Sequence, residues 1–256
     1  MKSEHKEMMK ARRRNIKLTL SYDGTNYHGF QRQTKVVAVQ NVLEGALFKL
    51  FGDGIELAAA GRTDAGVHAI GQVVNFFTDG TIPIQNVVRA GNRLLPDDIV
   101  LLKAEEADRD FSALHSVKSK IYIYKVFENE LADPFMSRFY WHVNKKLNLE
   151  DMQEALKYIE GEHDFSSFRS AGGNDTSPIR EIYEASCTKE KNVYTFKFWG
   201  SGFLYHMVRN IMGLMINIGL GRVDKHEVPK IIEAKNRALA GKMAPANGLY
   251  LQKVYY

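Results

Sequence analysis

The segment AAAGRTDAGVHA, residues 58–69, surrounds a single carboxylate, Asp64, with small residues. Small residues let a ligand or another backbone come close, and glycine permits backbone conformations that other residues avoid. One interpretation is a tight turn in which Asp64 caps backbone amides. The other is a carboxylate on an uncrowded loop that a bulky substrate can reach. His68 lies four residues after Asp64, and this pair could bind a metal only on a helix, so we expect His68 to be structural or to contact RNA.

A second chemically unusual residue is Arg209, which lies in the apolar segment GFLYHMVRNIMG. The spacing of the apolar residues predicts a buried helix over residues 203–217. A buried guanidinium is costly unless it pairs with a carboxylate or reaches water. We expect pairing, although the segment itself does not identify the acid.

Composition limits the classes of protein that the 256 residues can form. A hydrophobic content of 45% and a charged content of 25% are typical of a globular protein. The single cysteine, Cys187, allows neither an intrachain disulfide nor a thiolate metal cluster. With no membrane-length apolar run and no signal peptide, we expect a cytoplasmic protein without a membrane segment.

The net charge of +5 is concentrated at the N-terminus, where residues 1–14 contain six Lys/Arg and two Glu. These residues are expected to form a flexible basic tail. Lys118, Lys120 and Lys125 form a local basic cluster elsewhere in the chain. Such clusters can bind nucleic acid or remain an ordinary solvated face.

The order of predicted elements repeats along the chain. Strict alternation predicts a strand at 15–22, and helical or strand spacing predicts the other elements. In the first half, 15–110, they are a helix around 43–50, strands near 55–60 and 69–78, a helix at 83–94 and a strand at 99–105. In the second half, 111–256, they are strands at 117–127, 179–189, 193–200 and 248–256, helices at 149–161 and 203–217, and an extra helix near 224–234.

Both halves therefore have the order β-α-β-β-α-β, which predicts an α+β fold of two ferredoxin-like domains with antiparallel sheets and helices on one face. The open face of such a sheet can bind RNA. His163 and Asp164 are interpreted as a loop after a helix rather than as catalytic residues, with Arg169 as a possible RNA contact.

Six segments occur in order along the whole chain and together carry a resemblance. They are YDGTNYHGFQRQ (22–33), VQNVLEGAL (39–47), GRTDAGVHA (61–69), KSKIYIY (118–124), GFLYHMVRNIMG (202–213) and APANGLYL (244–251). The sequence resembles the TruA family of tRNA pseudouridine synthases. The motif around Asp64 is highly specific, and the segment from Phe203 to Arg209 supports the resemblance independently.

The resemblance implies a role for five residues. Asp64 matches the catalytic nucleophile of the family, and Arg62 matches the arginine that displaces the target nucleotide and fills its place. Tyr122 matches the tyrosine that stacks on the target uracil. Arg209 matches the arginine that pairs with the catalytic aspartate, and Leu249 the apolar residue that packs against the base.

The resemblance also implies an enzyme without cofactor or metal, with its two sheets joined into one central sheet. The implied partner is tRNA, at positions 38, 39 and 40 of the anticodon stem-loop, and the implied assembly is a homodimer. The chain departs from the family pattern at Phe30, Leu114 and His115, where the family often has Trp, Arg and an aromatic residue. A related enzyme with other target positions is therefore an alternative.

The chemistry of the reaction suits these residues. The C1′–N1 bond of uridine breaks, the uracil turns, and a C1′–C5 bond forms, so nothing is added or lost. A carboxylate can form and release a bond to carbon, and an arginine keeps it ionised. A non-catalytic RNA-binding protein would not explain Asp64, which repels phosphates. A nucleosidase would usually need a second carboxylate, which no motif supplies.

Overall fold

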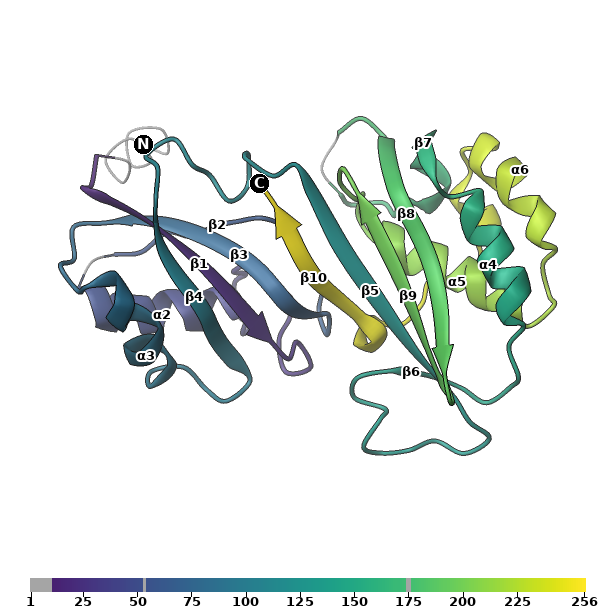
Figure 1. Cartoon of the computed structure of the whole chain (residues 1–256), viewed down its shortest axis with the longest axis horizontal. Helices are drawn as coiled ribbons and strands as arrows, with labels where there is room; N and C mark the ends of the chain where they lie inside the picture. Colours follow the sequence, from purple (N-terminus) through teal and green to yellow (C-terminus); the bar gives the residue numbers. More distant parts are fainter. Residues whose placement is uncertain (1–10, 53, 174–175) are drawn as a thin grey trace. The chain divides into compact units, whose positions relative to one another are not determined.

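The computed structural model describes residues 11–52, 54–173 and 176–256, and they form two compact units. The first unit contains residues up to Val117 together with Leu251–Tyr256, and the second contains Lys118–Tyr250. Over the described residues there are ten strands and five α-helices (Figure 1). The α+β class is therefore confirmed.

The elements of the first unit follow the predicted order. They are β1 (Arg14–Tyr22), α2 (Val39–Phe51), β2 (Ala58–Ala59), β3 (His68–Thr78), α3 (Ile84–Asn92) and β4 (Ile99–Ala107). The strands run in the order β4-β1-β3, and β2 pairs with β3, with every pair antiparallel. The predicted strand at 55–60 is reduced to two residues in β2.

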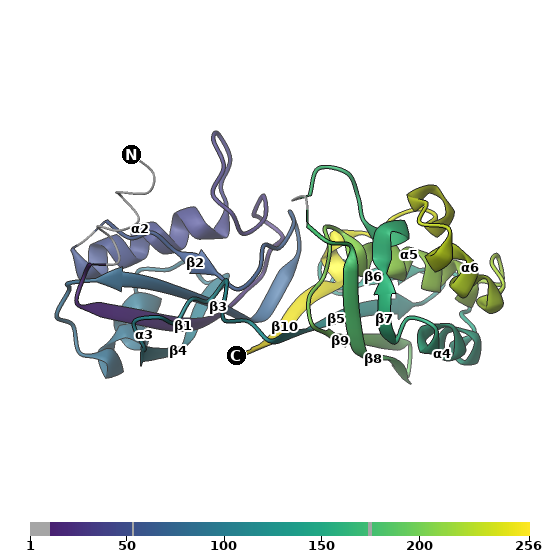
Figure 2. The same ribbon diagram turned by 90° about the horizontal axis from the view of Figure 1, so that it is seen from above.

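The alternation in β1 defines the core of the first unit. Ile16, Leu18 and Leu20 are fully buried on one face. The helices cover this face: Phe51 of α2 packs edge-on against Phe76 of β3, with ring centroids 5.2 Å apart. The view in Figure 2 shows α2 lying along the strands of this unit.

The second unit repeats the pattern with additions. Its elements are β5 (Ser119–Glu128), β6 (Trp141–Val143), α4 (Leu149–Lys157), β7 (Gly161–Asp164), β8 (Ile179–Glu190), β9 (Val193–Gly200), α5 (Met207–Gly219), α6 (Val228–Glu233) and the start of β10 (Leu249–Tyr255). The strands run in the order β5-β9-β8-β7 and are antiparallel. The short strand β6 pairs with β5 in parallel, which the prediction of purely antiparallel sheets did not include.

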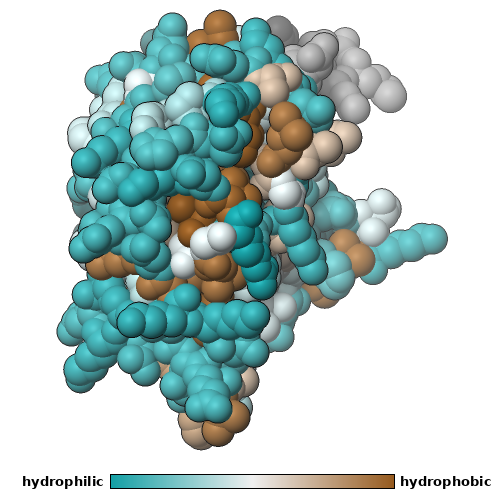
Figure 3. All heavy atoms as spheres, turned by 90° about the vertical axis from the view of Figure 1, so that its right-hand side faces the viewer, coloured by the Kyte–Doolittle hydropathy of each residue, from teal (hydrophilic) through white to brown (hydrophobic). Residues whose placement is uncertain are grey.

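The helices α4, α5 and α6 lie together beside the strands of the second unit (Figures 1 and 2). The face of the strands that they cover carries fully buried aromatic side chains, among them Tyr124, Phe196 and Phe198. The side of this unit shown in Figure 3 is mostly hydrophilic, with an apolar area near its middle.

Two sequence predictions differ from the structure in the second unit. His163 and Asp164 belong to β7, not to a loop, and Asp164 accepts a hydrogen bond from the Ser166 amide to begin a 3₁₀ turn. Helix α5 begins at Met207 rather than at 203, because His206 has a positive φ of 62° that no helix accommodates.

The basic N-terminal residues are only partly described. Residues 1–10 of the predicted tail lie outside the described residues. Arg12 donates to the carbonyl oxygens of Gly54 and Phe77, and Arg14 begins β1 and pairs with Glu106. Arg12 and Arg14, which the prediction placed in the tail, therefore make contacts within the first unit.

Candidate active site

Asp64 lies on a turn of the first unit between β2 and β3. The Val67 amide donates to the Asp64 carbonyl oxygen at 3.1 Å, which closes a four-residue turn. Gly66 has a φ of 76°, as the third position of a type II turn requires. The Asp64 side chain is half-buried, and that of Arg62 is exposed. A backbone turn therefore accounts for one of the small residues around Asp64.

Hydrogen bonds from β1 and β3 hold the residues before Asp64. The Tyr22 hydroxyl lies 2.7 Å from the Thr63 hydroxyl, and Gln72 donates to the Gly61 carbonyl oxygen at 2.9 Å. Burial raises the pKa of Tyr22 to about 12, against smaller lowering effects from Thr63 and Gln72. Tyr22 therefore remains protonated at neutral pH, and its contact with Thr63 persists.

The loop that follows β1 packs its backbone directly against the turn. A Cβ added to Gly24 would lie 2.0 Å from the Val67 carbonyl oxygen, and one added to Gly29 would lie 2.7 Å from that of Thr63. The Phe30 amide also donates to the Thr63 carbonyl oxygen at 3.0 Å. The backbone of residues 24–30 therefore holds the turn in place. This contact joins segments far apart in the sequence, and no local sequence pattern predicts it.

His68 is the buried first residue of β3, with only 1% of its surface exposed. Its Nδ1 atom accepts a hydrogen bond from the Gly24 amide at 3.0 Å and lies 3.2 Å from Oδ1 of Asp23. Of the two roles expected for His68, this burial favours the structural one.

In the second unit, Tyr122 lies on β5 on the face that the helices cover. Its Cα partner on β9 is Phe198, and its ring meets that of Phe203 edge-on at 5.0 Å. Tyr122 is 8% exposed, so a small part of its side chain reaches the surface.

Arg209 is fixed by the segment that precedes β10. Its Nε atom donates to the Ala244 carbonyl oxygen at 2.9 Å, and the Ala244 amide donates to the Arg209 carbonyl oxygen at 3.0 Å. The segment can approach because Gly213, one turn along α5, has no side chain: a Cβ there would lie 1.9 Å from the Lys242 carbonyl oxygen.

Leu249 follows this same segment and is 6% exposed. The Tyr124 hydroxyl donates to the Pro245 carbonyl oxygen at 2.7 Å, and Gly248 packs on the Tyr124 ring, where a Cβ would lie 2.6 Å from Cε1. Burial raises the pKa of Tyr124, although the charge of Arg209 opposes the shift. The segment 242–249 therefore lies between α5 and β5 and positions both Arg209 and Leu249.

The structure thus brings Tyr122, Arg209 and Leu249 into the second unit, and Asp64 and Arg62 into the first. Sequence reasoning missed the residues that fix them, chiefly Gly213, Ala244 and Tyr124. A signal was present in the APANG segment, because a Pro/Gly-rich stretch next to a strand often marks a close backbone approach.

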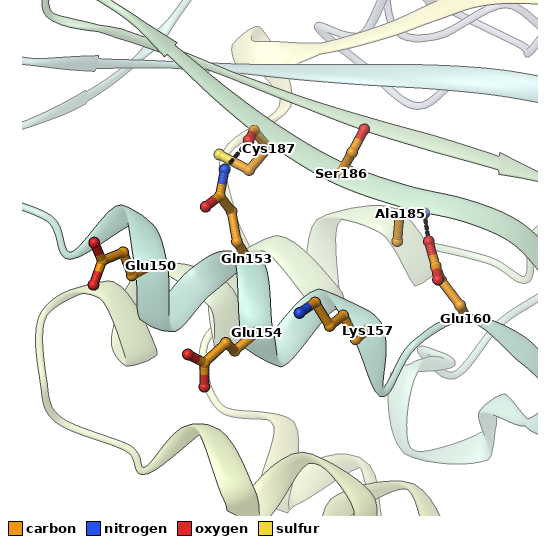
Figure 4. A pocket seen from close by; sticks show the side chains of 8 residues that line it. All are labelled: Glu150, Gln153, Glu154, Lys157, Glu160, Ala185, Ser186 and Cys187. Atoms are coloured by element: carbon orange, nitrogen blue, oxygen red, sulfur yellow. Dashed lines mark hydrogen bonds between the residues drawn. The ribbon is translucent and has the colours of Figure 1, made fainter.

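A hollow of about 510 Å³ lies elsewhere in the second unit, between α4 and β8 (Figure 4). Within it, Gln153 donates to the Cys187 carbonyl oxygen and Glu160 accepts from the Ala185 amide. These side chains form hydrogen bonds with backbone groups of β8 where β8 extends past its pairing with β7. Burial raises the pKa of Cys187 to about 12, so its thiol is not a nucleophile at neutral pH.

Among the described residues, no group of three or more His, Cys, Asp or Glu side chains is arranged to hold a metal ion. In the same part of the chain, no helix has both the length and the apolar character needed to span a membrane.

Known proteins match nearly the whole chain. The tRNA pseudouridine synthase family model matches residues 19–114 and 155–256. The tRNA pseudouridine synthase A of Acetivibrio thermocellus is 44% identical over 243 residues, which cover 95% of this chain and 100% of that protein. The protein of the same name from Ruminiclostridium cellulolyticum is 46% identical over 244 residues, with the same coverage. A solved archaeal box H/ACA sRNP Nop10–Cbf5 complex is remotely similar, with a TM-score of 0.38 and 9% identity over 78% of this chain and 44% of that chain.

The family model and these relatives indicate an isomerase that makes pseudouridine. The chain belongs to the tRNA pseudouridine synthase family.

The close approach at Gly213 leads to a testable prediction. Gly213→Ala should lower the free energy of unfolding by about 1–3 kcal/mol, because the added methyl group collides with backbone that cannot move aside cheaply. It should also displace the Ala244 carbonyl oxygen from Arg209 and reduce activity.

Gly45→Ala is the matched control for this change. Gly45 lies in α2, and an added Cβ would meet nothing within 4 Å. The control should be neutral or stabilising by up to about 1 kcal/mol, because alanine is the better helix former. Urea unfolding of both variants measures the difference, and equal stabilities would show that the segment 242–244 moves freely.

Proposed function

We propose that the chain isomerises uridine to pseudouridine at positions 38, 39 and 40 of the tRNA anticodon stem-loop, with Asp64 as nucleophile. The observation that carries the proposal is that GRTDAGVHA, with Asp64 at its centre, lies in residues 19–114, a stretch that the family model matches. The fixed turn that presents Asp64 supports it, since a catalytic group must be positioned before the substrate arrives.

The chemistry assigned to Asp64 is covalent catalysis. The carboxylate forms a bond to a carbon of the sugar or base while the C1′–N1 bond breaks. The uracil turns, and C5 bonds to C1′ while the bond between Asp64 and the nucleotide breaks. The proton of C5 then leaves and N1 takes up a proton, so the product has the same composition as the substrate.

The other residues act on the nucleotide. The uracil must leave the base stack to reach Asp64, which costs a few kcal/mol. Arg62 fills the vacated space: its guanidinium is exposed and, among the described residues, makes no hydrogen bond or ion pair. Tyr122 stacks on the uracil, and Leu249 packs against it.

Tritium release tests the reaction. The protein is incubated with tRNA that carries uridine tritiated at C5, and both released tritium and free uracil are measured. Tritium release with intact RNA, mapped to positions 38–40, is expected. Free uracil would indicate a nucleosidase, and other mapped positions would indicate a different target specificity.

Asp64→Asn should abolish turnover while tRNA binding stays within a few-fold, because the amide keeps the size of the side chain but is no nucleophile. Asp97→Asn is the control, since Asp97 is an exposed carboxylate of the same unit, and it should turn over normally. Product formed by a clean preparation of Asp64→Asn would contradict the assignment of Asp64.

Arg209 is proposed to be the cation that keeps Asp64 ionised during the reaction. Arg209→Leu should remove activity at little cost in stability, since a leucine of similar reach is tolerated where a buried charge stood. Arg209→Lys should also be largely inactive, because an ammonium lacks the planar two-pronged contact of a guanidinium. Near-normal turnover of Arg209→Leu, compared with Arg222→Leu as control, would contradict this role.

We also propose that the active protein is a homodimer. The family resemblance implies it, and the connection between β5 and β6 supports it. Leu131 and Phe135 of this connection are 74% and 88% exposed, the highest values among the exposed large apolar side chains of the described residues. Such residues commonly anchor an interface between protein chains.

Leu131→Ser together with Phe135→Ser should weaken the dimer, because the variant removes apolar surface that the partner would cover. Light scattering across micromolar concentrations measures the mass. A wild-type protein that is monomeric and fully active in this range would exclude the dimer.

A further inference from the structure

Two cationic side chains, Lys120 and Arg180, meet at one end of the second unit's strands. Lys120 on β5 is the Cα partner of Gly200 on β9, and Gly200 is in turn the partner of Ile182 on β8. Arg180 precedes Ile182 by two residues, so it lies on the same face of the sheet. Arg180 is the charged neighbour that acts on Lys120.

Two glycines, one at the end of β9 and one just after it, place no side chains beside these cations. Gly200 places no side chain between Lys120 and β8. The Arg180 side chain passes over Gly202, where an added Cβ would lie 3.5 Å from Nε and 3.6 Å from Cδ. No side chain of β9 therefore stands between the two cations, although Cδ1 of Ile182 packs over Gly200.

The pair lacks a counter-charge within the described residues. No described carboxylate pairs with Lys120 or Arg180. Among the described residues, Arg180 donates to the carbonyl oxygens of Ser177 and Ile179 and to the Thr176 hydroxyl. Burial, and next the charge of Arg180, lower the pKa of Lys120 to about 8. Two partly desolvated like charges in one place disfavour the free state and favour an anion between them.

The position of Tyr122 indicates which kind of anion would bind to Lys120 and Arg180. It lies two residues after Lys120 on the same strand and face, which places the two Cα atoms about 7 Å apart. A nucleic acid brings one phosphate with each nucleotide, and lysine and arginine are the usual phosphate ligands.

We propose that Lys120 and Arg180 bind one phosphodiester group of the RNA, next to the nucleotide whose base stacks on Tyr122. This inference rests on the proposed function and adds a binding site to it. The two residues hold the backbone of the displaced nucleotide, while Tyr122 holds its base.

Binding of a stem-loop RNA with a neutral methylphosphonate tests the site directly. The uncharged linkage is placed on the 5′ side or the 3′ side of the target uridine in separate RNAs. For wild type, one of the two should bind about tenfold or more weakly, the scale of a lost hydrogen bond to a charged group. Lys120→Gln should bind the unmodified RNA with the same loss and should be insensitive to either methylphosphonate.

Lys197→Gln is the matched control. Lys197 lies on β9 on the opposite face and pairs with Glu184, so this variant removes one positive charge from the same sheet. It should retain the methylphosphonate effect of wild type. Thermal unfolding and circular dichroism establish that each variant is folded. If each methylphosphonate lowers the RNA affinity of wild type and of Lys120→Gln by the same factor, the site is excluded.

The pH dependence supplies an independent readout. Among the described residues, Arg180 from β8 is the charged group that acts on Lys120, and the facing residue of β9 is Gly200. A bound phosphate raises the pKa of Lys120 above its free value of about 8, so binding takes up a proton. Affinity should therefore be constant below pH 8 and fall above it, by up to tenfold per pH unit.

Lys120→Arg should keep the affinity and lose its decline between pH 8 and pH 9.5, because arginine does not titrate there. A decline unchanged in Lys120→Arg would assign the titration to another group and overturn the inference. So would protection of the protein by inorganic phosphate alone without any methylphosphonate effect, which would indicate a site for free phosphate.

The binding measurements test the phosphate site separately from the proposed reaction. Phosphate-dependent binding without tritium release would contradict the proposed reaction and leave the site intact. Normal tritium release with unchanged RNA affinity in Lys120→Gln would contradict the site and leave the reaction intact.

Discussion

In both units the segments that carry the candidate functional residues are held by direct approach of one backbone to another, at positions where only glycine fits. Gly24 lies against the Val67 carbonyl group next to the Asp64 turn, and Gly213 lies against the Lys242 carbonyl group next to Arg209. Such contacts leave no room for a side chain to adjust. The backbone positions of Asp64 and Arg209 therefore depend on their neighbours and not on the substrate.

The two tyrosine hydroxyls that support these segments stay protonated at neutral pH. Burial raises the pKa of both Tyr22 and Tyr124, so each hydroxyl keeps its proton and its contact, one with Thr63 and the other with Pro245. Fixed dipoles of this kind need no reorganisation when charge develops during a reaction. Lys120 is different, since burial lowers its pKa to about 8, and its charge responds to what binds beside it.

Much of the fold was predictable because its elements have strong local patterns. The alternation of Ile16, Leu18 and Leu20 predicts β1, and the same rule predicts β8 and β9. The strands β6 and β7 were missed because three or four residues carry no period. The start of α5 was placed too early because the apolar spacing continues through Phe203 and Leu204, while the left-handed backbone of His206 has no signature in side-chain type.

The candidate site was less accessible from the sequence than the fold. The motif around Asp64 predicts one candidate residue, and the burial of Arg209's neighbours predicts that Arg209 needs a partner. The contact with Ala244 joins residues 35 positions apart, and the approach of Gly24 to Val67 spans 43 positions. Contacts over such separations depend on how strands and loops pack, which periodicity and propensity do not report.

The energetics of base displacement explain why the second unit would carry a phosphate site beside an aromatic one. Taking a nucleotide out of its stack costs a few kcal/mol. Stacking on one aromatic ring returns about 1–3 kcal/mol, and only 8% of Tyr122 is exposed, with Phe203 edge-on to its ring. A charged hydrogen bond contributes about 1.5–3 kcal/mol more. A held phosphate would therefore add to the stability of the displaced nucleotide by an amount comparable to that of stacking.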